Sequence, residues 1–215
     1  MKNFIYILIL ALILYSCNTF KENEVQIEFY SQDFKKLKTQ NELVVIDLDS
    51  IENFSELRKV MRKITCKGKA CGLKFNFNKT NYHITGFAHC PTNGTNCYFG
   101  RNILIINNDT LLTDFRNREN NRTIESLKSE LDSITSKVYN FQHNKDILKP
   151  ALIYLYIDDK YPISNTKKVL KEIAEQFKNI NSTNKLDYFQ YNILFESEDF
   201  FNVPPPPPPP PKIEK

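Results

Sequence analysis

The chain has 215 residues and a mass of 25.3 kDa, which suits one domain with added segments or two small domains and excludes a large multidomain enzyme. Hydrophobic residues make up 41% of the chain, with 16 Phe and 11 Tyr, so the chain as a whole is not intrinsically disordered. The net charge of +4 is too small for a nucleic-acid footprint, and the five glycines build neither a dinucleotide-binding motif nor a P-loop.

The N-terminus has the pattern of an export signal. Lys2 precedes an unbroken apolar run over residues 4–15, which is shorter than the roughly 20 residues needed to cross a bilayer. Ser16 and Cys17 close this run, and the segment resembles a bacterial lipoprotein signal, whose peptidase cuts before a cysteine that carries the lipid. The alternative is a plain signal peptide or an uncleaved anchor, in which the cysteine is incidental.

The lipoprotein resemblance implies a location and a first partner. Residues 1–16 would be removed, Cys17 would be lipidated, and the polar residues 17–23 would form a tether to the membrane. Each buried CH₂ of an acyl chain contributes about 0.8 kcal/mol to membrane binding. We therefore expect a membrane-anchored lipoprotein of the cell envelope that faces the periplasm or the cell surface.

Residues 24–101 are predicted to be a β-rich region with one helix. Residues 24–30 and 43–48 have strand composition, and Asn53, with Glu56 three residues on, is a typical start of a helix. Apolar residues mark the buried side of this helix, whereas its other side carries four basic residues, Arg58, Lys59, Arg62 and Lys63. That basic side is either a solvated helix face or a contact for anionic lipid or cell-wall polymer. Residues 73–77, 82–90 and 97–106 then predict a meander.

The cysteines agree with export. Besides Cys17 the chain has four, Cys66, Cys71, Cys90 and Cys97, and an even number in an exported chain predicts two disulfides. Proximity favours pairing within each local pair, and an Asn-Gly turn lies between the last two, but all three connectivities remain open. No metal is expected.

Two sharper alternatives use the same region. One is a zinc site built from these cysteines with His83 and His89, against which the absence of a CxxC spacing counts. The other is a Cys–His nucleophile from His89 and Cys90, which is disfavoured because adjacent strand residues point to opposite faces. His143 lies in a polar linker and is expected at the surface.

Residues 102–202 alternate strand and helix. Apolar residues at spacings of three and four from Ile124 to Val138 predict an amphipathic helix, and residues 151–157 predict a central strand buried on both faces. A polar turn follows, Ser164 is expected to cap the next helix, and residues 188–195 close the sheet. This order predicts two βαβ-like crossovers onto one sheet with helices on one face, and an α+β fold for the whole chain.

The same region resembles the soluble domain of the ExbD/TolR family of biopolymer-transport proteins. A hydrophobic strand that ends in Ile157-Asp158, a polar turn, and a helix with the aliphatic pair Val169-Leu170 match the family pattern. The resemblance implies a periplasmic domain that forms homodimers and engages a protein partner in the envelope. It does not extend to the family's proton-relaying membrane aspartate, because residues 4–15 contain no Asp or Glu.

These observations predict a non-enzymatic envelope lipoprotein that mediates protein–protein contact, associated with an ExbD/TolR-type energy-transduction or transport complex. The turn residues Asp158, Asp159, Tyr161 and Ser164 are the candidate partner-binding residues. The alternative is a lipoprotein that binds cell-wall polymer or a small ligand and has no transport role. No hydrolase motif is present and no cofactor is expected.

The C-terminal tail, residues 203–215, contains eight consecutive prolines at 204–211. Such a run favours a polyproline II helix, about 25 Å long at 3.1 Å per residue. It is either a stiff spacer or a preformed ligand for an aromatic-lined groove.

Overall fold

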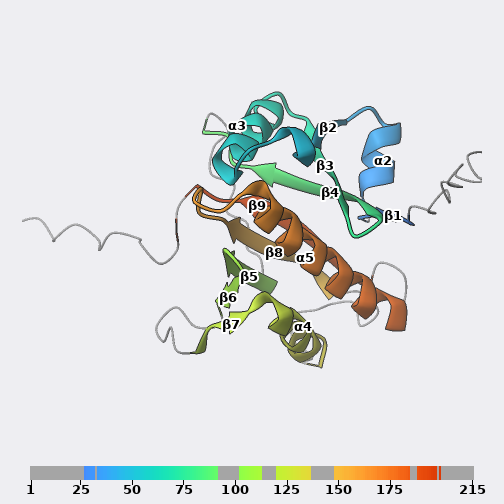
Figure 1. The fold of residues 1–215 in the computed structure, drawn as a ribbon. Helices are drawn as coiled ribbons and strands as arrows, with labels where there is room; N and C mark the ends of the chain where they lie inside the picture. Colours follow the sequence, from blue (N-terminus) through green and yellow to red (C-terminus); the bar gives the residue numbers. More distant parts are fainter. Residues whose placement is uncertain are drawn as a thin grey trace, which may run out of the picture.

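The computed structural model describes residues 27–31, 33–91, 102–112, 120–136, 148–184, 188–197 and 199. In this part the chain is a mixed α+β fold with one nine-stranded sheet. Eight strands follow the order β2-β3-β4-β9-β8-β5-β6-β7, and the ninth, β1, pairs with β4 (Figure 1). Several predicted features lie outside the described residues and stay predictions: the signal segment, Cys17, Cys97, His143 and the proline run.

The first part of the described chain, residues 27–88, contains four strands and two α-helices. In chain order its elements are β1 (Ile27–Tyr30), α2 (Phe34–Thr39), β2 (Leu43–Asp47), the 3₁₀ turn η1 (Leu48–Ser50), α3 (Phe54–Thr65), β3 (Ala70–Phe77) and β4 (Thr80–Ala88).

The predicted start of α3 is confirmed. The Asn53 side chain accepts a hydrogen bond from the Glu56 backbone N–H at 2.9 Å, and the Glu56 carboxylate in turn accepts from the Glu52 N–H at 2.8 Å. These two bonds satisfy N–H groups that would otherwise lack partners at the first turn. The short helix α2 was not predicted, because Phe34 is its single buried residue and one apolar residue shows no periodicity.

The predicted meander is wrong beyond its first hairpin. β3 and β4 are antiparallel, and Asn78 and Lys79 make the tight turn between them with positive φ. The next strand, β5 (Asn102–Asn107), does not lie beside β4, because β9 and β8 separate the two. Its residues Leu104 to Ile106 are buried in succession, and this burial on both faces suits a parallel strand in the sheet interior.

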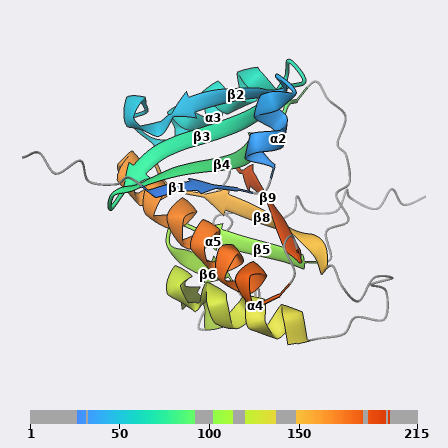
Figure 2. The ribbon, with the colours of Figure 1, turned by 90° about the vertical axis from the view of Figure 1, so that its right-hand side faces the viewer.

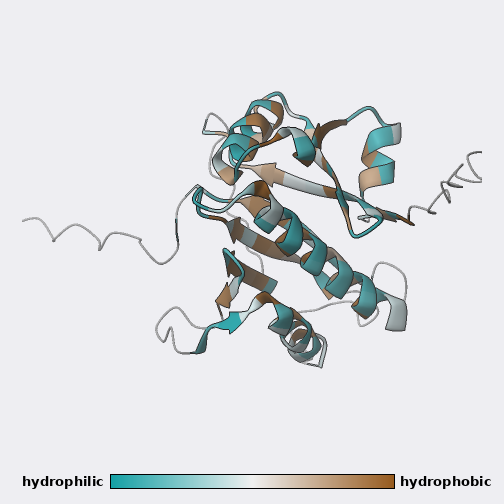
Figure 3. Cartoon of the chain, viewed as in Figure 1, coloured by the Kyte–Doolittle hydropathy of each residue, from teal (hydrophilic) through white to brown (hydrophobic). Residues whose placement is uncertain are grey.

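The second part alternates strand and helix. Its elements are β5, β6 (Thr110–Leu112), β7 (Arg122–Thr123), the 3₁₀ turn η3 (Ile124–Ser126), α4 (Leu127–Ser136), β8 (Leu148–Tyr156), α5 (Ile163–Thr183) and β9 (Phe189–Phe195). β5, β8 and β9 run parallel, with α4 before β8 and α5 between β8 and β9. Figure 2 shows α4 beside the lower end of α5, and Figure 3 shows α5 hydrophilic on its outer side over hydrophobic strands.

Aromatic contacts show how the helices cover the sheet. Phe54 of α3 stacks on Phe195 of β9 with ring centroids 5.6 Å apart, and Phe177 of α5 contacts Phe189 and Tyr191 of the same strand. Residues 189, 191 and 195 alternate along β9, so α3 and α5 lie on the same face of it.

Helix α2 covers the opposite face, over β3 and β4. A Cβ on Gly72 would lie 2.7 Å from the Phe34 ring of α2, whereas the neighbouring Cys71 contacts Met61 of α3. Adjacent strand residues point to opposite faces, so the sheet is sandwiched between α2 on one side and α3 on the other. Gly72 leaves the room in which the Phe34 ring packs.

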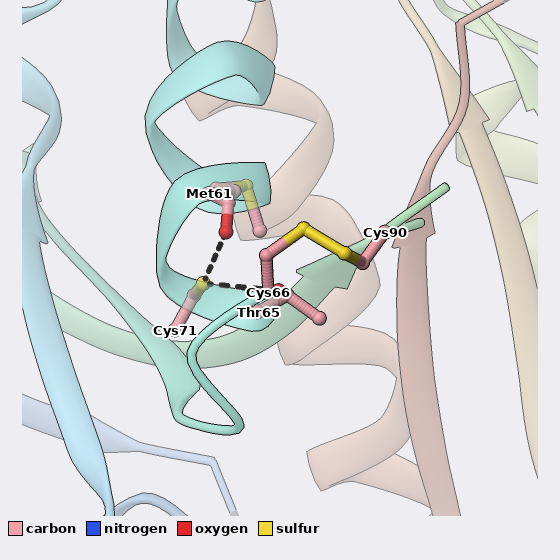
Figure 4. Close-up of a disulfide and its surroundings, with 5 residues drawn as sticks. All are labelled: Met61, Thr65, Cys66, Cys71 and Cys90. Atoms are coloured by element: carbon pink, nitrogen blue, oxygen red, sulfur yellow. Dashed lines mark hydrogen bonds between the residues drawn. A yellow bond between two sulfur atoms is a disulfide. The ribbon is translucent and has the colours of Figure 1, made fainter. Parts of the chain in front are cut away.

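The disulfide in the structure is not one of the two predicted local pairs. Cys66, which ends α3, is bonded to Cys90, just beyond β4, with Cα atoms 5.3 Å apart (Figure 4). Cys71 is a buried thiol that donates to the Met61 carbonyl at 3.4 Å. The antiparallel hairpin explains this pairing, because it returns the end of β4 to the end of α3, while Cys71 points underneath the helix.

Two smaller findings concern the helices. Pro162 rather than Ser164 precedes the first residue of α5, and Ser164 is exposed inside the first turn, so the predicted capping role of Ser164 is wrong. Proline fits this place because its fixed φ and missing N–H cost nothing at a helix start.

Within the part of the chain that the structure describes, no helix combines the length and apolarity needed to cross a bilayer.

Candidate functional site: the gap between β1 and β9

The sheet splits along one edge of β4. β1 pairs with residues 80–83 of β4, whereas β9 pairs only with Phe87 and Ala88 further along the same strand. β3 occupies the other edge of β4. The first half of β9 therefore diverges from β4, and β1 lies between the two strands without pairing with β9. We call the space between them the β1–β9 gap.

The edge of β1 that faces away from β4 pairs with none of the strands in the described part of the chain. The N–H of Ile27 donates to the carbonyl of Lys79, just before β4, at 3.2 Å, and the N–H of Ser31 donates to the carbonyl of His83 in β4 at 2.8 Å. Because backbone groups of successive strand residues point to opposite edges, those of Glu28 and Tyr30 point away from β4. Among the described strands, β1 pairs with β4 alone.

The edge of β9 that faces the gap is capped at one end by a side chain. The Asn181 amide of α5 accepts from the Phe189 N–H at 2.7 Å and donates to the Phe189 carbonyl at 3.0 Å, as a neighbouring strand would. By the same alternation, the backbone groups of Tyr191 point to this side, while those of Tyr188 point to β8. No described strand pairs with β9 there.

A cavity of about 450 Å³ fills the gap. It is lined by residues of β1, α2, α5 and β9 and of the segment after β1, namely Glu28, Phe29, Tyr30, Ser31, Lys35, Ala174, Phe177, Lys178, Asn181, Ser182 and Tyr191. Glu28, Phe29 and Tyr30 are consecutive and point to alternate faces, so the cavity approaches β1 from its edge. It thus lies in the plane of the sheet, between α2 and α5.

The two walls of the cavity differ in character. Towards α5 it is aromatic and aliphatic: Phe29, Ala174, Phe177 and the ring of Tyr191. The Tyr191 hydroxyl is buried and has no hydrogen-bond partner among the residues that the structure describes, and burial raises its pKa. Towards α2 lies Tyr30, whose ring stacks on His83 with centroids 4.4 Å apart.

The free charges at the cavity are positive. Lys35 Nζ lies 4.4 Å from the centre of the Tyr30 ring, and Lys178 Nζ lies 5.4 Å from that of Phe29. Neither lysine forms an ion pair within the described part of the chain. Glu28 is engaged elsewhere: hydrogen bonds from Asn81 and then His83, at 2.8 and 2.7 Å, hold the pKa of its carboxyl below the usual range.

The predicted partner-binding residues lie at another place. Asp158 accepts from the Lys160 N–H at 3.0 Å, and this bond, with the Lys160 ammonium, lowers the pKa of Asp158. Asp159 accepts from the Ser55 N–H in the first turn of α3 at 2.8 Å, and Tyr161 lies under the Lys160 ammonium.

These turn residues precede α5, whereas the cavity contacts α5 from residue 174 onwards, about 15 Å further along the helix. The structure therefore does not bring the turn and the cavity together. A partner-binding role for the turn stays a prediction.

Among the residues that the structure describes, neither alternative at the cysteines is assembled. Cys90 is held in the disulfide, so it is not a free nucleophile beside the exposed His89. His83 contacts Glu28 and Tyr30 rather than a cysteine. No group of three or more potential metal ligands occurs among the residues that the structure describes.

Sequence reasoning missed the β1–β9 gap because its residues come from four elements and read as ordinary core aromatics and surface lysines. Asn181 was equally inconspicuous in an Asn-rich chain. Comparisons with known proteins add no relative: no family model, no curated protein and no solved structure matches the chain.

Proposed function

We propose that this protein is a membrane-anchored envelope lipoprotein that mediates protein–protein contact by taking an extended segment of a partner protein into the β1–β9 gap. The observation that carries the proposal is the pair of strand edges, with the backbone groups of Glu28, Tyr30 and Tyr191 turned towards an aromatic-lined cavity. An inserted strand would pair with these groups, and each such hydrogen bond is worth about 0.5–1.5 kcal/mol net.

The size of the cavity limits what enters. At about 3.3 Å per residue, a cavity of about 450 Å³ accepts a short extended stretch and not a folded element. The aromatic rings at its wall supply apolar contact area with few rotatable bonds to immobilise, which favours a specific contact. Nothing in this arrangement calls for a reaction, and the proposed role is non-enzymatic.

The envelope location rests on two features. The N-terminal signal pattern with Cys17 resembles that of lipoproteins, and the Cys66–Cys90 disulfide suits an oxidising compartment. Within this proposal, the partner belongs to an ExbD/TolR-type transport or energy-transduction complex, which is the association that the sequence resemblance favours. Self-association into a homodimer is the variant in which the partner is a second copy.

One observation favours the alternative of a cell-wall polymer or small-ligand binder. Lys59, Arg62 and Lys63 are exposed together on α3, while the fourth basic residue, Arg58, donates to the Glu196 carbonyl at 2.9 Å. Three free cations on one helix side suit an anionic polymer.

The test blocks the gap and compares the protein partners that are captured. Ser182 is exposed and lines the cavity, so Ser182→Trp fills the entrance without disturbing the core. Ser164→Trp is the matched control, because it is also exposed on α5 but lies at the Asp158 turn. Full-length tagged chain is used to capture proteins from solubilised membranes. We expect Ser182→Trp to abolish capture of the specific partner and Ser164→Trp to leave it intact.

Three outcomes would contradict the proposal. Loss of the partner with Ser164→Trp alone would move the contact to the turn. Equal capture by both variants would show that the gap is not used. Retention of cell-wall polymer with no protein partner, abolished by reversing the charges of Lys59 and Arg62, would establish the alternative.

A further inference from the structure

Resting on the proposed function, we infer that the segment taken into the β1–β9 gap alternates acidic and apolar residues. The inference rests on the position of the cavity in the plane of the sheet, between α2 and α5. A strand placed there would send successive side chains to opposite faces. The partner's odd and even residues would therefore meet different walls, and the chemistry of each wall selects one set.

The wall on the α5 side selects apolar side chains. Phe29, Phe177 and Ala174 present carbon atoms there, and the Phe177 and Tyr191 ring centroids are 4.4 Å apart. Away from Lys178, a charged side chain packed against these rings would lose its hydration without gaining a partner, which costs several kcal/mol for a buried ion. Val, Ile or Phe would instead bury apolar surface.

The wall on the α2 side selects carboxylates. Lys35 extends over the Tyr30 ring at this side. Lys178 belongs to α5 and stands at the opposite wall, where the cavity meets a second one of about 280 Å³ that is also lined by Glu175. Glu28, the acidic lining residue, is already bonded to Asn81 and His83. An incoming Asp or Glu on this side can therefore pair with the ammonium group of Lys35, whereas an incoming Lys or Arg meets a like charge.

Three labelled peptides of eight residues test this selection, with Val at alternate positions and Glu, Gln or Lys between them. Binding to the full chain in detergent is followed by fluorescence anisotropy. We expect the Val/Glu peptide to bind about fivefold more tightly than the Val/Gln peptide, and the Val/Lys peptide to bind most weakly, because Lys35 adds a modest, salt-sensitive attraction. Lys35→Glu should reverse the order of the Glu and Lys peptides.

Lys38→Glu is the matched control, because Lys38 is exposed on the same helix and does not line the cavity. It should leave the preference for Val/Glu intact, and Ser182→Trp should abolish binding of all three peptides. Equal binding of the three peptides to the wild-type chain, together with loss of all three in Ser182→Trp, would overturn the inference and keep the strand site.

The remaining outcomes also decide. No peptide binding, with partner capture still sensitive to Ser182→Trp, would overturn the inference alone. No peptide binding with insensitive capture would remove the proposed function as well. Self-association of the free chain that Lys35→Glu abolishes would identify the occupant as a second copy and overturn the assignment to a separate partner.

Discussion

At the scale of single residues, two side chains have roles that the neighbouring sequence does not predict. Asn181 satisfies both backbone groups of Phe189, so this end of β9 is stable without a strand beside it. Among the described residues, no side chain substitutes in this way at the next groups along the edge, those of Tyr191. Cys71 is the other case, since its thiol lies under α3 instead of forming the predicted bond to Cys66.

The thiol of Cys71 should make stability fall at alkaline pH. Burial raises the pKa of Cys71 to about 11, above its value near 9 in an unfolded chain. The folded state therefore holds a proton that the unfolded state loses, and the contribution is complete below pH 9 and lost as pH rises towards 11. Urea unfolding at pH 7, 9 and 10 should show this decline, and Cys71→Ala should flatten it. A decline of equal size in the variant would contradict the assignment.

At the scale of elements, the disulfide ties two of them together. Cys66 ends α3, and Cys90 follows β4, so the bond holds the helix over the hairpin that it covers. Leu57 and Met61 of α3 are buried in the core and also hold the helix against the sheet. The crosslink and the core thus support one arrangement, in which α3 also covers Phe195 of β9.

Removal of this disulfide should lower the free energy of unfolding by about 3 kcal/mol, because the bond closes a loop between residues that are 24 apart in sequence. The measurement compares the wild-type chain with the Cys66→Ser, Cys90→Ser double variant in denaturant. Reductant should bring the wild-type chain to the stability of the variant and leave the variant unchanged. Peptide mapping that finds Cys66 bonded to Cys71, or Cys90 to Cys97, would refute the pairing.

At the scale of the molecule, the two predicted regions share one sheet. β4 belongs to the region before residue 101 and β9 to the region after it, and their pairing joins the two halves. A Cβ on Gly86 of β4 would lie 2.7 Å from the Phe195 ring of β9, so the halves also interlock through side chains. The β1–β9 gap exists because this junction is short and the strands diverge beyond it.

We expect a lipid on Cys17 to anchor the whole molecule to a membrane. Cys17→Ala should release the protein from membranes and abolish incorporation of a labelled fatty acid, because two or more acyl chains are needed for stable attachment. Fractionation and intact-mass analysis measure both effects. Cys71→Ala serves as a control that removes another cysteine and should not alter partition. Unchanged partition of Cys17→Ala would refute the lipoprotein assignment.

Local patterns in the sequence sufficed for several elements. The cap formed by Asn53 and Glu56, the turn at Asn78, and the alternation of strand and helix from β5 to β9 depend on residues close together in the chain. Turn geometry and apolar periodicity act over such short distances, so they can be read without the fold. The exported, membrane-anchored character of the chain is likewise an expectation from its first 17 residues.

Tertiary structure alone decided which distant parts meet. The neighbour of β5, the partner of Cys66 and the space between β1 and β9 depend on contacts between residues far apart in sequence, and several pairings satisfy the same local patterns. Packing selects among these pairings: Cys71 and Gly72 point to opposite faces of β3, and the Phe34 ring packs on the Gly72 face while α3 packs on the Cys71 face. The gap follows from that packing, because a sheet that holds β1 at one end of β4 and β9 at the other cannot close between them.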